Sequence, residues 1–194
     1  RQIGEQVSVV FSSLKEIIYK TMDPFLFRGL KRKINGFELR FPLRVARYFP
    51  GDYEPHKHKF ISENAFGVAV DAGAHIGYYT VLMARNYELV LAFEPTTDTR
   101  KYLEKTVKMN RLTNVKIRDE AISDEVGKVN FLFDKNTASV CNRIVYGVHN
   151  ASSTKCISLD SLDIKIDFLK LDIEGAEILA LKGADKILSQ LSFL

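Results

Sequence analysis

A glycine-containing turn after a short apolar run is the first feature that indicates ligand chemistry. Residues 68–77 read Val-Ala-Val-Asp-Ala-Gly-Ala-His-Ile-Gly, a pattern typical of a strand that turns into a helix with backbone N–H groups facing a ligand. Asp71 would repel a pyrophosphate and attract the sulfonium and ammonium of S-adenosylmethionine. The G-x-G-x-x-G pattern of dinucleotide sites is also incomplete, because His75 replaces its middle glycine. We therefore predict that residues 71–77 bind S-adenosylmethionine, with close strand-to-helix packing as the alternative role of the glycines.

A second acidic position follows the next apolar run. Glu94 lies about twenty residues beyond the glycine turn, where a carboxylate can accept hydrogen bonds from both hydroxyls of a ribose. Pro95 then ends the strand. After the third apolar run we expect Glu120 or Ala121 to contact adenine, and a solvated turn is the alternative. These positions extend the predicted cofactor site.

The segment Lys-Leu-Asp-Ile-Glu-Gly-Ala-Glu at 170–177 places three carboxylates around a strand end and a helix start. Helix capping, with Glu177 closing the cap, is one explanation. The other is a site for a cation, because like charges this close raise each other's pKa unless a cation lies between them. Glu174 or Asp172 can then accept the proton of a hydroxyl that attacks the methyl group. We also predict that Asp172 contacts the cofactor and that Glu177 contacts the substrate.

The remaining metal-ligand types do not form a convincing set. A divalent ion beside the carboxylates would acidify the hydroxyl directly, but no second group of ligands is evident. His56-Lys57-His58 lies in what we interpret as a solvated basic loop. Cys141 and Cys156 lack CxxC spacing and are expected to pack as small apolar residues. No metal is predicted.

Composition limits the class of protein. The formal net charge of +4 is mild, and the basic residues are mixed with acids, so no nucleic-acid partner is required. No apolar stretch has the length of a membrane span, and Arg1 to Lys20 lack the cleavage site of a signal peptide. With two cysteines and no disulfide framework, a cytoplasmic location and no membrane partner are expected.

Short apolar runs alternate with helical patterns beyond about residue 60, which predicts an α/β fold with a mainly parallel, Rossmann-like sheet flanked by helices. Between the third and fourth strands, two shorter strands should flank an irregular insert. The expected strands are 68–71, 89–93, 115–117 and 168–171, the shorter ones 128–133 and 154–157, and the helices 77–86, 97–110 and 176–188.

The N-terminal region has a different pattern and is predicted to be a helix-and-hairpin cap over residues 1–60, with the methyltransferase core at 61–194. An amphipathic helix is expected at 7–18. Asn35-Gly36 between two short alternating runs predicts a tight hairpin. At the other end, 191–194 resembles the start of another buried strand. An exposed parallel edge is normally avoided, so we expect continuation of the chain or a second copy to cover it.

With these residues in place, the chain from about Tyr53 onward resembles the FkbM family of S-adenosylmethionine-dependent methyltransferases. No single motif is specific, but their order and spacing together are. The matching pieces are Val70-Asp71-Ala72-Gly73-Ala74-His75-Ile76-Gly77-Tyr78-Tyr79-Thr80, Ala92-Phe93-Glu94-Pro95, the helix with Asn110, Ala121-Ile122-Ser123-Asp124, Ser158-Leu159-Asp160 and Leu171-Asp172-Ile173-Glu174-Gly175-Ala176-Glu177.

The resemblance implies a Rossmann-like fold and O-methylation of a sugar or another small hydroxylated molecule. It implies cofactor roles for Asp71, Gly73, Gly77 and Glu94, and the predicted site also includes Ala74, His75, Tyr78 and Pro95. Tyr53-Glu54 is similar to a pair that precedes the first strand in the family, which suggests that Glu54 contacts the substrate. Family members usually continue beyond Leu194, so residues from later strands cannot be named.

Three other functions compete with this prediction. A nucleic-acid methyltransferase fits the basic pI of about 9.0, but the fourth strand lacks the Asn- or Asp-Pro-Pro-aromatic signature of amino-group methylation. Acids at the acceptor site would also repel phosphate. A non-catalytic scaffold that binds S-adenosylmethionine is the second, and an NAD-dependent oxidoreductase, opposed by Asp71, is the third.

Overall fold

The computed structural model describes residues 29–132, 143–144 and 152–191. The helix predicted at 7–18, Cys141 and all but the first residue of the run 191–194 lie outside these ranges. Within them, no helix is long and apolar enough to cross a bilayer.

The centre of the fold is a four-stranded parallel sheet in the order β10-β3-β4-β5. Its strands are β3 (Val68–Ala72), β4 (Leu89–Phe93), β5 (Val115–Arg118) and β10 (Phe168–Leu171). This confirms the α/β class and the four predicted strands. Because the chain moves outward from β3 through β4 to β5 and then returns to the other side of β3, the strand order reverses between β3 and β10. Ligands of open α/β sheets bind beyond the carboxyl ends of the strands at such a reversal.

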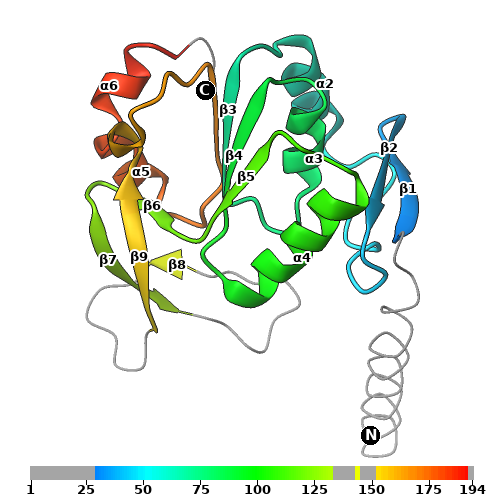
Figure 1. The fold of residues 1–194 in the computed structure, drawn as a ribbon, viewed down its shortest axis with the longest axis horizontal. Coiled ribbons are helices and arrows are strands. Elements are labelled where there is room, and N and C mark those ends of the chain that lie inside the picture. Colours follow the sequence, from blue (N-terminus) through cyan, green and yellow to red (C-terminus); the bar gives the residue numbers. More distant parts are fainter. Residues whose placement is uncertain (1–28, 133–142, 145–151, 192–194) are drawn as a thin grey trace, which may run out of the picture.

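Helices cover both faces of this sheet (Figure 1). On one side lie α3 (Tyr78–Ala84) and α4 (Thr97–Met109), and on the other α5 (Glu177–Lys182) and α6 (Asp185–Leu188). The single helix predicted at 176–188 is wrong, because the chain breaks at Gly183. A Cβ at Gly183 would lie 2.6 Å from the carbonyl oxygen of Ser123, and Asp160 accepts the N–H groups of Lys186 and Ile187 that open α6.

A second sheet follows β5, in the order β6-β9-β7-β8. Its strands are β6 (Ala121–Ser123), β7 (Gly127–Leu132), β8 (Arg143–Ile144) and β9 (Ser152–Ser158), and the 3-10 helix η1 (Leu159–Leu162) comes after β9. The two short strands predicted in this region are confirmed as β7 and β9, whereas β6 was not anticipated. Cys156 is buried beside Val129, which agrees with an ordinary packing role.

The predicted hairpin is confirmed as β1 (Leu30–Ile34) and β2 (Phe37–Phe41), with Asn35 and Gly36 at φ of 50° and 82°. It is anchored to the end of α4, since Asn110 accepts the Arg40 N–H at 2.9 Å and donates to the Arg40 carbonyl at 2.7 Å. Ile34 also shares one hydrophobic cluster with Val81 of α3. The hairpin therefore packs on the same core as the helices beside it.

The loop expected around His56 is wrong, because residues there form α2 (Pro55–Glu63), although His56 itself is exposed to solvent as expected. Pro55 occupies the start of this helix, where its fixed φ favours a helix and its missing N–H costs nothing. Ile61 is the buried residue of α2, and it joins the cluster that contains Tyr78 of α3. The helix thus packs on the same core as α3.

Candidate active site

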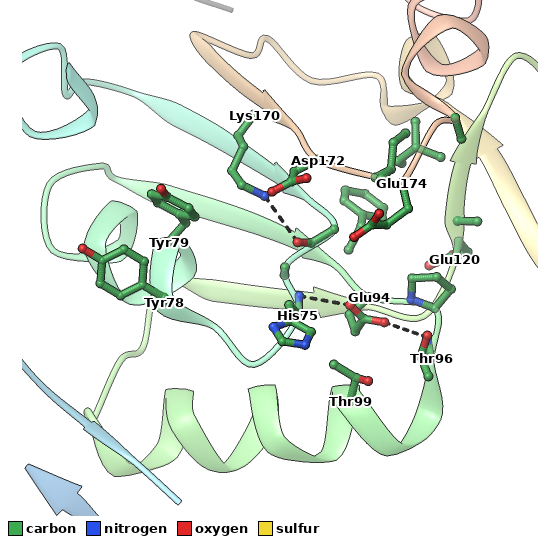
Figure 2. A pocket seen from close by; sticks show the side chains of 18 of the residues that line it. His75, Tyr78, Tyr79, Glu94, Thr96, Thr99, Glu120, Lys170, Asp172 and Glu174 are labelled. Atoms are coloured by element: carbon green, nitrogen blue, oxygen red, sulfur yellow. Dashed lines mark hydrogen bonds between the residues drawn. The ribbon is translucent and has the colours of Figure 1, made fainter. Parts of the chain in front are cut away.

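A cavity opens beyond the carboxyl ends of the central strands, where the strand order reverses (Figure 2). Its walls come from the turn after β3, the residues after β4, the start of β6 and the segment after β10. Ten of the predicted site residues line it: Gly73, Ala74, His75, Tyr78, Glu94, Pro95, Glu120, Ala121, Asp172 and Glu174. Four others, Asp71, Gly77, Glu54 and Glu177, are not among its lining residues. The cavity brings together segments that lie up to a hundred residues apart in the chain.

Glu94 is the most constrained acid in the cavity. One carboxylate oxygen accepts the N–H of His75 at 3.0 Å and the other accepts the N–H of Thr96 at 2.9 Å. Only 7% of the residue is exposed, and this burial raises the pKa of Glu94 despite the two N–H donors. The side chain of Thr96 also hydrogen-bonds to this carboxylate. An ionised carboxylate has about four lone-pair sites, so Glu94 can still accept a further donor such as a ribose hydroxyl.

The turn after β3 is held against both neighbouring strands. The N–H groups of Gly73 and Ala74 donate to the carbonyl of Phe93 at 3.0 and 2.9 Å. Gly73 has φ +77°, and a Cβ there would lie 1.9 Å from the backbone oxygen of Asp172. Gly77, in contrast, packs against α4, where a Cβ would meet the side chain of Leu103. Gly73 therefore shapes the cavity, whereas Gly77 has the packing role.

Replacing Gly73 with Ala is expected to destabilise the fold by at least about 2 kcal/mol more than replacing Gly36. Both glycines have similar positive φ values, +77° and +82°, but nothing lies within 4 Å of a Cβ at Gly36. The Gly36→Ala control therefore measures backbone strain alone. Urea denaturation of the two variants checks the difference, and equal losses would show that the turn moves away from Asp172 without cost.

Asp71 lies behind the cavity wall and not at its surface. Its carboxylate is fully buried, accepts the hydroxyl of Thr80 at 2.6 Å and lies 3.0 Å from the ammonium of Lys170. The charge that was expected to attract the cofactor's cations is thus compensated inside the protein. Sequence analysis did not assign Lys170, although a lysine within an otherwise apolar strand is itself a signal of a buried partner.

Asp172 and Glu174 are the exposed acids at the end of β10. In Figure 2 Asp172 lies beside Lys170, and Glu174 extends on the other side, nearer Glu94. Glu174 and Gly175 both have positive φ, 56° and 93°, a conformation that non-glycine residues adopt at an energetic cost and that is concentrated at functional sites. Glu177 instead accepts the Ile173 N–H at 2.9 Å, a bond within the segment between β10 and α5 that does not cap the helix.

Aromatic side chains form another part of the cavity wall. Phe49, Tyr53 and Tyr79 all pack around Tyr78, with ring centroids 4.9–5.4 Å from its ring. Burial raises the pKa of Tyr53 to about 12, so its phenol stays protonated. Sequence analysis missed Phe49 and Tyr79, because aromatic residues in apolar segments are more often simple core residues.

Two residues act behind this wall. Glu54 accepts a short hydrogen bond from the Tyr79 hydroxyl and is paired with Lys57, so it orients Tyr79 from outside the cavity. His58 Nδ1 lies 2.9 Å from the Tyr78 hydroxyl. The described part of the chain contains no group of three or more His, Cys, Asp or Glu residues placed to hold a metal ion.

His75 occupies the turn between Ala74 and the start of α3. It has φ +52°, its N–H is bound by Glu94, and its ring makes an edge contact with Tyr48. Burial and the nearby charge of Lys170 lower the pKa of His75, so the ring is neutral at pH 7. Its backbone holds Glu94 in place, while its ring lines the cavity without a charge.

The start of β6 contributes a further part of the cavity lining. Glu120 is bound by the Arg118 guanidinium at 2.7 and 3.1 Å, so its charge is neutralised. Ala121 and Ile122 are buried, and Thr99 of α4 also lines the cavity. This is a suitable environment for a flat, weakly polar ring.

Comparison with known proteins identifies the family of the chain. The Methyltransferase FkbM domain matches residues 71–193. Methyltransferase 1 of Beauveria bassiana (strain ARSEF 2860) is 24% identical over an alignment of 167 positions, and the match covers 67% of this chain and 66% of that protein's length.

Among solved structures, an rRNA methylase from Streptococcus thermophilus is 16% identical with a TM-score of 0.46, and the match covers 71% of this chain and 63% of that one. A putative methyltransferase from Streptococcus mutans in complex with SAH is 15% identical with a TM-score of 0.40, covering 71% and 65%. These two similarities are too distant to support an argument about function. The family match covers well over half of the chain and includes the turn after β3, Glu94 and the acids after β10, so the chain belongs to the FkbM methyltransferase family.

Proposed function

We propose that the chain is an S-adenosylmethionine-dependent methyltransferase that methylates a hydroxyl of a sugar or another small molecule. The observation that carries the proposal is the position of Glu94. Its carboxylate is held by two backbone N–H groups at the carboxyl end of β4, one strand from the glycine turn, with lone pairs left for a ribose.

The lining residues suit the separate parts of this cofactor. Glu94 would accept the ribose hydroxyls, and the buried Ala121 and Ile122 would contact adenine. The turn at Gly73, where the structure has no room for a Cβ, and the exposed Asp172 would hold the amino-acid end. When bound, S-adenosylmethionine supplies an electrophilic methyl group on a sulfonium.

Glu174 is the residue that we assign to proton removal. Its carboxylate lines the cavity on an exposed, left-handed turn, so an acceptor hydroxyl can reach it from solvent. A general base of this kind accepts the hydroxyl proton while the oxygen attacks the methyl group. The rings of Tyr53 and Tyr79 would position the acceptor and exclude water from this end of the cavity.

The charges of the cavity support a small, non-phosphorylated acceptor. Asp172 and Glu174 are exposed, and an acceptor phosphate would be repelled by both. This favours a small-molecule hydroxyl over nucleic acid. The cytoplasmic location, and the covering of the outer edge of β10 by later chain or a second copy, stay predictions.

Isothermal titration calorimetry with S-adenosylmethionine, S-adenosylhomocysteine and NAD tests the cofactor. We expect micromolar binding of the first two, since they share the adenosine and amino-acid parts that the cavity matches, and no measurable binding of NAD. Binding of NAD without any response to the other two would overturn the proposal.

A further inference from the structure

Lys170 is the feature of the cavity that the proposed function has not used. Among the described residues that line the cavity it is the only lysine or arginine. Its ammonium lies 3.0 Å from Asp71 and 3.3 Å from the carbonyl oxygens of Ala72 and Gly73. The side chain thus touches the glycine turn at three places.

The ion pair between Lys170 and Asp71 has one partner inside the protein and the other at the cavity surface. The Asp71 side chain is 0% exposed, whereas 13% of the Lys170 side chain is exposed, and only the lysine lines the cavity. The pair therefore presents its positive end to the cavity. The same charge lowers the pKa of the neighbouring His75, which shows that its field reaches the turn.

Opposite charges line the same cavity. Lys170 and Asp172 are both among its lining residues, they are two positions apart along the chain, and Asp172 has solvent access. An amino-acid group in its zwitterionic form needs one cationic and one anionic partner within a few ångströms of each other. Lys170 and Asp172 together provide that pair.

We propose that Lys170 recognises the carboxylate of the cofactor's amino-acid end, with Asp172 facing its ammonium. Because the three N–H donors of Lys170 face Asp71 and the carbonyls of Ala72 and Gly73, this recognition acts through the positive charge of the ammonium. This inference rests on the proposed function, because it requires a cofactor with an amino-acid group. It makes Lys170 a specificity-determining residue, which separates complete cofactors from adenosine compounds that lack this group.

The test compares two ligands that differ only at this end. S-adenosylhomocysteine carries the amino-acid group, and 5′-methylthioadenosine keeps the adenosine and the thioether without it. By calorimetry, Lys170→Met is expected to weaken S-adenosylhomocysteine binding roughly tenfold or more and to leave 5′-methylthioadenosine binding within about twofold. Lys170→Arg should keep most of the preference for S-adenosylhomocysteine over 5′-methylthioadenosine, because arginine retains the positive charge.

A purely structural role predicts a different result. If Lys170 only supports the turn, both ligands lose affinity equally, and that outcome would overturn the inference, as would unchanged binding of both. The double variant Asp71→Asn/Lys170→Met avoids a stranded buried charge and should show the same ligand selectivity. If the wild-type protein binds neither ligand, the proposed function fails instead.

Lys165→Met is the matched control. Lys165 forms a similar pair with Asp167, at 2.6 Å, just before β10 and outside the cavity, so its loss should change neither affinity. A second readout needs no ligand: NMR titration of His75 should show a higher ring pKa in Lys170→Met than in Lys165→Met, because only the first removes the positive charge beside the ring. An unchanged His75 titration would contradict the conclusion that the positive charge of Lys170 acts on the cavity side of the ion pair.

Discussion

Replacing Glu174 with Gln is expected to lower kcat at least about 100-fold while S-adenosylmethionine affinity stays within about twofold. The amide matches the carboxylate in size but cannot accept the proton of an attacking hydroxyl. Because Glu174 lies on the turn after β10 and makes no contact that holds Glu94 or the glycine turn, the cofactor site should survive the change.

The measurement uses an acceptor found by screening hydroxylated sugars and small molecules with the wild-type protein. Methyl transfer is then followed in single turnovers, and binding by calorimetry. Glu104→Gln, an exposed change on α4 away from the cavity, is the control and should leave both unchanged. Normal turnover in Glu174→Gln would show that Glu174 is not the base. The Asp172→Asn variant would then test whether Asp172 accepts the proton.

Replacing Glu94 with Gln is expected to weaken S-adenosylmethionine binding at least about tenfold, because a hydrogen bond to a charged acceptor contributes about 1.5–3 kcal/mol. The amide also turns one N–H acceptor into a donor that opposes the N–H of His75 or Thr96. Calorimetry measures the loss, and thermal unfolding shows whether the fold is retained. Glu88→Gln, an exposed change just before β4, is the matched control.

The affinity of the wild-type protein should also depend on pH. Burial raises the pKa of Glu94 in the free protein, and ribose hydroxyls donate to the ionised form. Binding therefore favours ionised Glu94, and affinity falls as the pH falls through this raised pKa. The Glu94→Gln variant should lack this dependence, and an equal fall in the variant would assign the effect to another group.

Much of the fold was accessible from the sequence because its signals are local. The runs at 68–71 and 89–93 are short, apolar and bounded by turn residues, and both became strands of the central sheet. Asn35-Gly36 determined the hairpin because both positions need positive φ. Errors arose where a contact distant in sequence decided the outcome, as at Gly183, where the backbone of Ser123 approaches and the helix breaks.

The candidate site likewise contains residues that local sequence signals predicted and residues that depend on contacts distant in sequence. Residue type and spacing were enough to single out Gly73, Glu94, Asp172 and Glu174, since each follows a strand directly and parallel strands end at one edge. The partner of a buried charge cannot be inferred in that way. Lys170 comes about a hundred residues after Asp71 along the chain, and only the parallel pairing of β10 with β3 places the two side by side.

The sequence by itself determined that an acid-rich cavity follows a glycine turn in an α/β sheet, because strand, turn and carboxylate are adjacent in the chain. The tertiary structure alone decided which of those acids line the cavity. It buried Asp71 against Lys170, bound Glu177 to the backbone of Ile173 and placed Glu54 behind Tyr79, because burial and pairing depend on neighbours that the chain brings together only when it folds.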